Sequence, residues 1–303
     1  MPALRVTFLV AVVAFAWLGL RGRWDEVGDA LAATSPLGVV AGFVLVLLGL
    51  SATGVLWLRL MTCLDARLPY VGGSSTFFVG QLGKYIPGSV WSIGAQAEMA
   101  RRYRVPARAT VSAGLLFLGY HVATGVLVAT PALLRGRLDS PWPDWVTVVA
   151  AGVAVIGLVP AVVQVLGRTI GGRPVRIGWT DTLVFLVLMA VAWAAYGAAL
   201  VLLSPGTPWA DLPELTGAFA AAYAVGVVIV FAPAGLGARE AVFVLLLTPV
   251  TGVGPATALA LLARVVHTAA DATVAACWWA LARRAPGAAA PGLAQPSRSS
   301  TSS

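Results

Sequence analysis

The chain has 303 residues, of which 59% are hydrophobic and only 11% are charged. A mean hydropathy of +0.89 excludes a soluble globular domain and indicates a helical membrane protein, because several apolar runs approach the roughly 20 residues that cross a bilayer. The net charge of +8 does not indicate nucleic-acid binding, because the basic residues lie in short loops between apolar runs, where they act as topology signals.

In chain order, the hydrophobic pattern predicts six long transmembrane helices, at about 5–20, 36–58, 107–133, 145–167, 181–203 and 255–281. Two further apolar regions, about 71–105 and 212–250, are interrupted by proline and glycine. We expect each to be a re-entrant hairpin that enters and leaves the membrane on one side. In a rival layout 212–231 and 238–250 are two crossings, but the second is then only about 20 Å long, which is short for a bilayer.

Charge placement predicts the orientation of these helices. With the N-terminus in the cytoplasm, most of the 20 basic residues fall in cytoplasmic segments, as the positive-inside rule requires. We therefore expect a multi-pass protein of the bacterial inner (cytoplasmic) membrane with both termini cytoplasmic. Residues 1–284 form the predicted transmembrane domain, in halves of about 1–135 and 140–284. The composition of residues 285–303 predicts a disordered cytoplasmic tail.

The order span, span, hairpin, span occurs twice, which predicts an inverted repeat. Pro233 matches Pro87 in the two hairpins, and the spans that follow them begin with "VPARAT" and "GPATAL". The two histidines, His121 and His267, fall in mid-span in those helices. Chance recurrence is the alternative, because helix breakers are common in membrane helices. If the repeat is real, the broken segments indicate the binding site of a transporter.

Charged residues occur at the predicted depth of the membrane. Arg239 and Glu240 follow the tip of the second hairpin, and Arg264, His267 and Asp271 project from one face of the last span. An ionised residue at a helix centre costs about 2.5 to 3.5 kcal/mol, so four of them would cost roughly 10 kcal/mol in lipid. These groups must therefore face the protein interior, pair with each other or line water.

Two interpretations of these charges stay open. In the structural one, salt bridges of Arg239 with Asp271 or of Arg264 with Glu240 lock the hairpin to the last span. In the functional one, a half-helix that starts near Gly237 turns its free N–H groups and positive dipole end toward an anion, and the two arginines add charge. The carboxylates and the histidine would then be counter-charges or proton carriers.

The first hairpin carries fewer candidate residues. Lys84 and Tyr85 lie beside its break at Pro87 and Gly88. Glu98 is about 16 Å further along a helix, which places it near the inner membrane surface. Lys84 and Tyr85 are therefore the stronger candidates of this hairpin.

The segments "KYIPGSVWSIGAQAE" (84–98) and "APAGLGAREAVF" (232–243) together resemble the flippase-like family that includes the transmembrane region of lysylphosphatidylglycerol synthases. The resemblance covers most of residues 1–284, and its most specific part is the Pro-x-Gly-x-Gly-x-Arg-Glu core of the second segment. Members of that family are integral membrane proteins implicated in moving lipids or lipid-linked glycans between leaflets. The resemblance implies roles for Pro233, Gly235, Gly237, Arg239, Glu240 and Arg264.

Two departures from the family limit what the resemblance implies. Many members carry an acidic residue in the span after the first motif, where this chain reads "LFLGYHVATG", so a paired-carboxylate mechanism is not expected there. The soluble aminoacyl-transferase domain of the synthases is also absent from the sequence, so synthesis of aminoacylated lipid is not expected.

The leading functional prediction is a translocase for a lipid or a lipid-linked glycan, which binds an anionic headgroup at mid-membrane depth. The alternatives are an intramembrane enzyme that acts on lipid phosphate or glycan, and a non-catalytic scaffold of a glycan-assembly system. We expect no cofactor, metal site or nucleic-acid partner, and we expect membrane lipids, polyprenyl-linked glycans, glycosyltransferases or cell-envelope assembly proteins as partners. The candidate substrate-binding residues are Lys84, Tyr85, Pro87, Gly88, Glu98, Pro233, Gly235, Gly237, Arg239, Glu240, Arg264, His267 and Asp271.

Overall fold

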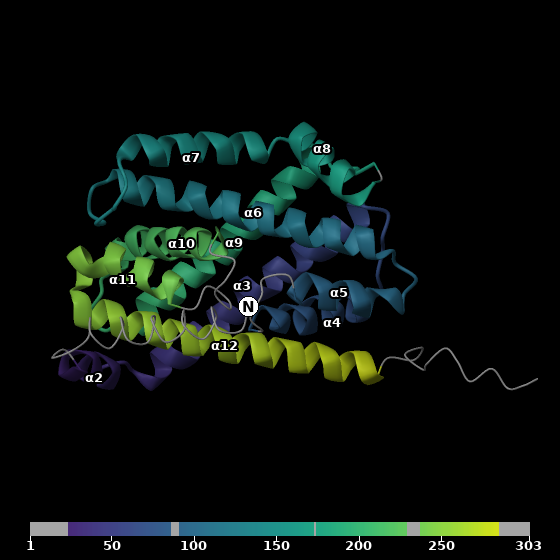
Figure 1. Cartoon of the computed structure of the whole chain (residues 1–303). Coiled ribbons are helices and arrows are strands. Elements are labelled where there is room, and N and C mark those ends of the chain that lie inside the picture. Colours follow the sequence, from purple (N-terminus) through teal and green to yellow (C-terminus); the bar gives the residue numbers. More distant parts are fainter. Residues whose placement is uncertain (1–23, 86–90, 173, 229–236, 285–303) are drawn as a thin grey trace, which may run out of the picture.

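The computed structural model describes residues 24–85, 91–172, 174–228 and 237–284, and within these ranges it is helical with no strand (Figure 1). The all-helical fold class is confirmed. Four helices in these ranges are long and apolar enough to cross a membrane, which supports a multi-pass membrane protein: α3 (Pro36–Cys63), α6 (Ala107–Leu134), α9 (Trp179–Leu203) and α12 (Val253–Arg284). They correspond to four of the six predicted spans, and the span predicted at 5–20 lies outside the described residues.

The remaining predicted span, 145–167, is not one straight helix. It consists of α7 (Asp144–Gly157) and α8 (Pro160–Gly171), whose axes differ by 73°. Pro160 explains the break, because proline has no N–H to continue the helix and its ring disfavours a helical conformation in the preceding Val159. The described chain therefore has four candidate spans, or five if the bent pair crosses as one.

The first interrupted region forms two short antiparallel helices. These are α4 (Tyr70–Gln81), continued by the 3-10 turn η1 (Leu82–Tyr85), and α5 (Trp91–Arg101). Gly80 of α4 contacts Gln96 of α5, and Gly83 of η1 contacts Ser92. A side chain at either glycine would push the two arms apart, so the glycines allow the close packing of the pair.

The second interrupted region forms the pair α10 (Leu212–Val228) and α11 (Ala238–Thr251), preceded by the 3-10 turn η2 (Trp209–Asp211). The rings of Phe219 in α10 and Phe243 in α11 lie 6.0 Å apart, and Arg239 at the start of α11 lies over the ring of Tyr223, 5.6 Å from its centroid. Pairing of the end of one helix with the start of the next shows that these arms are also antiparallel.

The start of α4, in the first helix pair, and the start of α10, in the second, lie at opposite ends of the bundle. Tyr70, at the start of α4, packs edge-on against Trp278, near the end of α12, with 5.4 Å between the rings. Asp211, just before α10, accepts a 2.8 Å hydrogen bond from Arg137, which follows the end of α6. The first pair is thus anchored where α12 ends, and the second where α6 ends.

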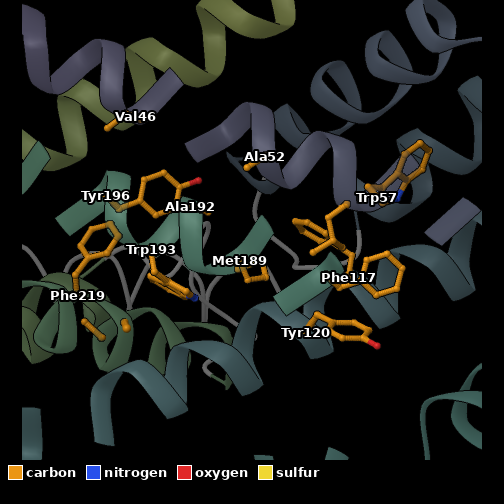
Figure 2. Close-up of a cluster of buried hydrophobic side chains, with 14 of the residues drawn as sticks. Val46, Ala52, Trp57, Phe117, Tyr120, Met189, Ala192, Trp193, Tyr196 and Phe219 are labelled. Atoms are coloured by element: carbon orange, nitrogen blue, oxygen red, sulfur yellow. The ribbon is translucent and has the colours of Figure 1, made fainter. Parts of the chain in front are cut away.

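The long helices pack through small residues. Gly42 and Gly49 of α3 contact Leu203 and Tyr196 of α9, so the two backbones approach closely, as is common between membrane helices. Helix α2 (Trp24–Ala32) lies against the start of α12, where Gly254 contacts Glu26. Figure 2 shows buried aromatic side chains of α9 and α10 gathered at one side of the core, next to those of α3 and α6.

Candidate functional site

A cavity of about 300 Å³ lies between the two short helix pairs and the long helices α3, α6, α9 and α12. This volume is at the lower end of the range for small-molecule sites, so it suits a headgroup rather than a whole lipid. Most of its wall is apolar or aromatic. Among the described residues, the ionisable groups that line it, besides two histidines and three tyrosines, are Lys84, Arg239, Arg264 and Asp271.

An ion pair joins the first helix pair to α12 inside this cavity. Lys84 Nζ lies 2.6 Å from Asp271 Oδ2, and the Tyr85 hydroxyl donates a 2.7 Å hydrogen bond to the same oxygen. The side chain of Asp271 is only 6% exposed, whereas that of Lys84 is 34% exposed. The lysine therefore balances a buried carboxylate while it keeps access to the cavity.

A second ion pair joins the second helix pair to α12. Arg264 Nη1 donates a 3.0 Å hydrogen bond to Glu240 Oε1. The other carboxylate oxygen, Oε2, accepts a 2.8 Å hydrogen bond from the backbone N–H of Gly237, which begins α11 with φ of 86°. Glycine is the residue that tolerates this backbone conformation, and Glu240 closes the N-terminus of its own helix in the manner of a capping box.

Arg239 is held differently from the other cations of the cavity. Its guanidinium lies over the ring of Phe219, 4.4 Å from the centroid, and 5.6 Å from the centroid of Tyr223. Within the described ranges it forms no ion pair with a carboxylate. Cation–π contacts orient a guanidinium without neutralising it, so Arg239 brings a positive charge to the wall of the cavity.

A stack of rings supports the side of the cavity near Arg239. His121 of α6 is stacked on Tyr223 with 4.3 Å between ring centroids, and Trp193 of α9 meets the histidine edge-on at 5.2 Å. Trp193 Nε1 donates a 3.1 Å hydrogen bond to Thr124 Oγ1, one turn after the histidine. His121 is therefore mainly a packed ring of the wall that fixes Tyr223, which in turn contacts Arg239.

His267 lies between the rings of Tyr196 and Phe219, at 5.2 and 5.1 Å. Its Nδ1 is 2.8 Å from the carbonyl oxygen of Ala263. Because a carbonyl only accepts hydrogen bonds, Nδ1 carries the proton. The buried Nε2 is left without a hydrogen-bond partner among the described residues.

The structure brings most of the predicted site residues together. Six of them line the cavity: Lys84, Tyr85, Arg239, Arg264, His267 and Asp271. Glu240 lines a recess of about 20 Å³ behind it, which shares Arg239 and Arg264 with the cavity, and Gly237 caps α11. Four others lie outside the described residues: Pro87, Gly88, Pro233 and Gly235.

Glu98 is not part of this arrangement. Its carboxylate is 74% exposed and pairs with Arg101 on the same helix at 3.1 Å. Of the two salt bridges that the structural interpretation predicted, Arg264 with Glu240 is present. Asp271 pairs with Lys84 instead of with Arg239.

The aromatic wall was not predicted from the sequence. Phe219 and Tyr223 lie four residues apart in α10 and so share a face of the helix. Trp193 is an indole in the middle of a span, away from the membrane interfaces where tryptophan gathers. Both patterns could have indicated a lined interior site, but each is also typical of ordinary helix packing.

No group of three or more His, Cys, Asp or Glu residues in the described part of the chain is placed to hold a metal ion. No protein-family model and no curated protein matches the chain. The functional conclusion therefore depends on the geometry of the cavity.

Proposed function

We propose that this chain binds the anionic headgroup of a membrane lipid or lipid-linked glycan in the cavity and moves it between the two leaflets. The observation that carries the proposal is the position of Arg239, a guanidinium on the cavity wall that no described carboxylate neutralises. A charge at membrane depth is costly unless it serves a partner, and a phosphate matches a guanidinium in charge and geometry.

The rest of the cavity fits such a ligand. Arg264 and Lys84 also line the cavity and add positive charge to it, although each is paired with a carboxylate. The volume of about 300 Å³ accommodates a phosphate with a small headgroup, and acyl or polyprenyl chains would stay in the surrounding lipid. Aromatic rings that line the cavity offer faces for the apolar parts of the headgroup.

We also propose the finer membrane arrangement that the sequence predicts. Each antiparallel pair, α4 with α5 and α10 with α11, is a re-entrant hairpin, and the two hairpins enter from opposite membrane surfaces. In this layout six helices cross, both termini are cytoplasmic, and the halves form an inverted repeat, as the apolar runs, the charge placement and the repeated motifs of the sequence predict. Movement of one half against the other would expose the cavity to each leaflet in turn.

The test uses proteoliposomes with fluorescent lipids that carry an anionic phosphodiester headgroup or a polyprenyl phosphate. The wild type should accelerate transbilayer movement of at least one of them. Arg239→Ala should slow it by about tenfold or more, because the loss of one charged hydrogen-bond donor costs about 1.5 to 3 kcal/mol. Arg176→Ala is the matched control, since this side chain is 80% exposed and lies outside the cavity. Equal rates for the wild type and Arg239→Ala would refute the assignment of the site.

Lipid analysis of a deletion strain separates the translocase from the alternative of an intramembrane enzyme. Unchanged lipid chemistry with an altered distribution between leaflets supports transport. New or missing lipid species with normal leaflet distribution would support an enzyme that uses the same cavity.

A further inference from the structure

The carboxylate of Glu240 already occupies the place of an anion in the proposed site. One oxygen accepts the Gly237 N–H at 2.8 Å, and the other accepts from Arg264 at 3.0 Å. A helix N-terminus and an arginine are both groups that commonly bind phosphate in proteins. The chain thus supplies its own anion where an external anion would be attracted.

Glu240 lies on the side of the two arginines that faces away from the large cavity, and this position decides from which side a ligand can reach them. Glu240 lines the small recess, whereas Arg239 and Arg264 line both the recess and the large cavity. The recess measures about 20 Å³, which is room for a single water molecule and not for a phosphate. A headgroup must therefore bind on the cavity side, where it competes with Glu240 for Arg264.

We propose that Glu240 is an internal competitor that sets the affinity of the cavity for anionic headgroups. In the state described, Arg239 is available to the ligand while Arg264 is held by Glu240. Binding of a phosphate draws Arg264 away from the carboxylate and leaves Glu240 on the N-terminus of α11 alone. The inference rests on the proposed function, because it describes how the same site is regulated.

This arrangement predicts an effect opposite to that of an ordinary binding residue. Removal of the Glu240 charge should tighten binding of an anion, since Arg264 then loses its competing partner. Most of this effect should pass through Arg264, which is the guanidinium that Glu240 holds directly. Glu240→Gln is the suitable change, because the amide keeps an oxygen to cap Gly237 while it loses the charge.

The experiment measures equilibrium binding of dioctanoyl phosphatidate to the purified full-length chain in neutral detergent. Dioctanoyl phosphatidylcholine has matched tails without net charge, and inorganic phosphate tests whether a free anion suffices. The dissociation constant for phosphatidate should fall by about tenfold in Glu240→Gln, a typical coupling between two groups at one site. Glu240→Asp keeps the charge on a shorter side chain and should give an intermediate value.

Two further variants make the result specific. Glu214→Gln is the matched control, because Glu214 is also a first-turn glutamate of a short helix that pairs with an arginine, Arg137, but lies outside the cavity. It should leave the dissociation constant unchanged. In an Arg264→Gln background, Glu240→Gln should tighten binding much less than it does in the wild type.

Unchanged or weaker phosphatidate binding in folded Glu240→Gln and Glu240→Asp would overturn the inference about Glu240. If Arg239→Ala loses binding in the same assay, the proposed function still stands. If the wild type and Arg239→Ala bind phosphatidate and phosphatidylcholine equally well, both fail together. Tighter binding of phosphatidate without any binding of inorganic phosphate would identify the lipid headgroup, rather than a free anion, as the competitor of Glu240. Thermal unfolding of each variant in the same detergent shows whether it is folded.

Discussion

Lys84 Nζ and Asp271 Oδ2 lie 2.6 Å apart at the wall of the cavity, although the two residues are far apart in the chain: 186 positions separate Asp271 from Tyr85, the residue next to Lys84. The contact joins η1, which follows α4 in the first helix pair, to the middle of α12, the longest helix in the described part of the chain. Its two partners differ in environment, because the carboxylate is buried and the ammonium is partly exposed. Loss of the lysine and loss of the aspartate should therefore have different effects on stability.

We expect Lys84→Gln to destabilise the protein more than Asp271→Asn. The first leaves a carboxylate of 6% exposure without its counter-charge, which costs about 2 kcal/mol once the remaining Tyr85 hydrogen bond is considered. The second leaves an ammonium that can reach water, at about 1 kcal/mol or less. Thermal unfolding in detergent measures both, and the double variant should be more stable than Lys84→Gln alone. The reverse order would show that the pair is not formed as described.

Gly49→Ala should destabilise the contact between α3 and α9. A β-carbon at this position would collide with the ring of Tyr196, which lines the cavity. Overpacking of this kind costs about 1 to 3 kcal/mol, and displacement of the ring into the cavity should also weaken headgroup binding.

The matched control is Gly119→Ala in α6, where an added β-carbon meets nothing within 4 Å. There the change should be neutral or stabilise by up to about 1 kcal/mol, because alanine is the better helix former. Equal melting temperatures for the two alanine variants would contradict the close packing at Gly49.

Arg137→Ala should lower the melting temperature more than Arg135→Ala. Arg137 is 3.2 Å from Glu214 and donates a 2.8 Å hydrogen bond to Asp211, whereas Arg135 is 3.9 Å from the same glutamate. Glu214 is only 2% exposed, so its carboxylate depends on the closer arginine. Similar losses in both variants would count against this arrangement.

The hydrogen bond to Asp211 and the charge of Glu214 raise the pKa of Arg137. A raised pKa in the folded state means that the arginine stabilises the fold fully below its unfolded value, and the effect declines only as the pH rises past about 12. The difference between the two variants should therefore not depend on the arginine's titration anywhere in the ordinary pH range. A difference that vanished between pH 8 and about 10 would contradict this.

Cysteine labelling from one side of the membrane tests the re-entrant hairpins. In a chain with Cys63 and Cys277 replaced by serine, single cysteines at Arg67 and Arg104, which flank α4 and α5, should react with an impermeant reagent from the same side. Cysteines at Gly206 and Gly252, which flank α10 and α11, should both react from the other side. Labelling of the two ends of either pair from opposite sides would show that the pair crosses the membrane, so that the six-span layout is wrong.

The sequence predicted the long helices well because uninterrupted apolar runs leave few alternatives. It did not predict the bend within 145–167, where the apolar pattern continues across Pro160 while the straight helix does not. Hydropathy measures side-chain transfer and carries little information on backbone geometry. Packing decides whether a proline inside an apolar run ends the helix, since Pro131 lies within α6 without ending it.

For the candidate site, the cost of charge in a membrane predicts that Arg239, Arg264 and Asp271 face the protein interior, and all three line the cavity. Their partners could not be predicted, because pairing depends on how the helices pack. The choice of Lys84 for Asp271 needs the first helix pair to lie against α12, a contact between distant parts of the chain. The aromatic wall was missed for the same reason, since rings from three helices meet there.

Arg264 and Asp271 lie seven residues apart on α12, which is about 10 Å along the helix axis. Each is tied to a different helix pair, by a cation on one side and a carboxylate on the other. Helix α12 is therefore linked by an ion pair to each of the two short helix pairs. A tilt or axial slide of this one helix would strain both ion pairs at once, so any displacement of one helix pair along α12 would be felt by the other.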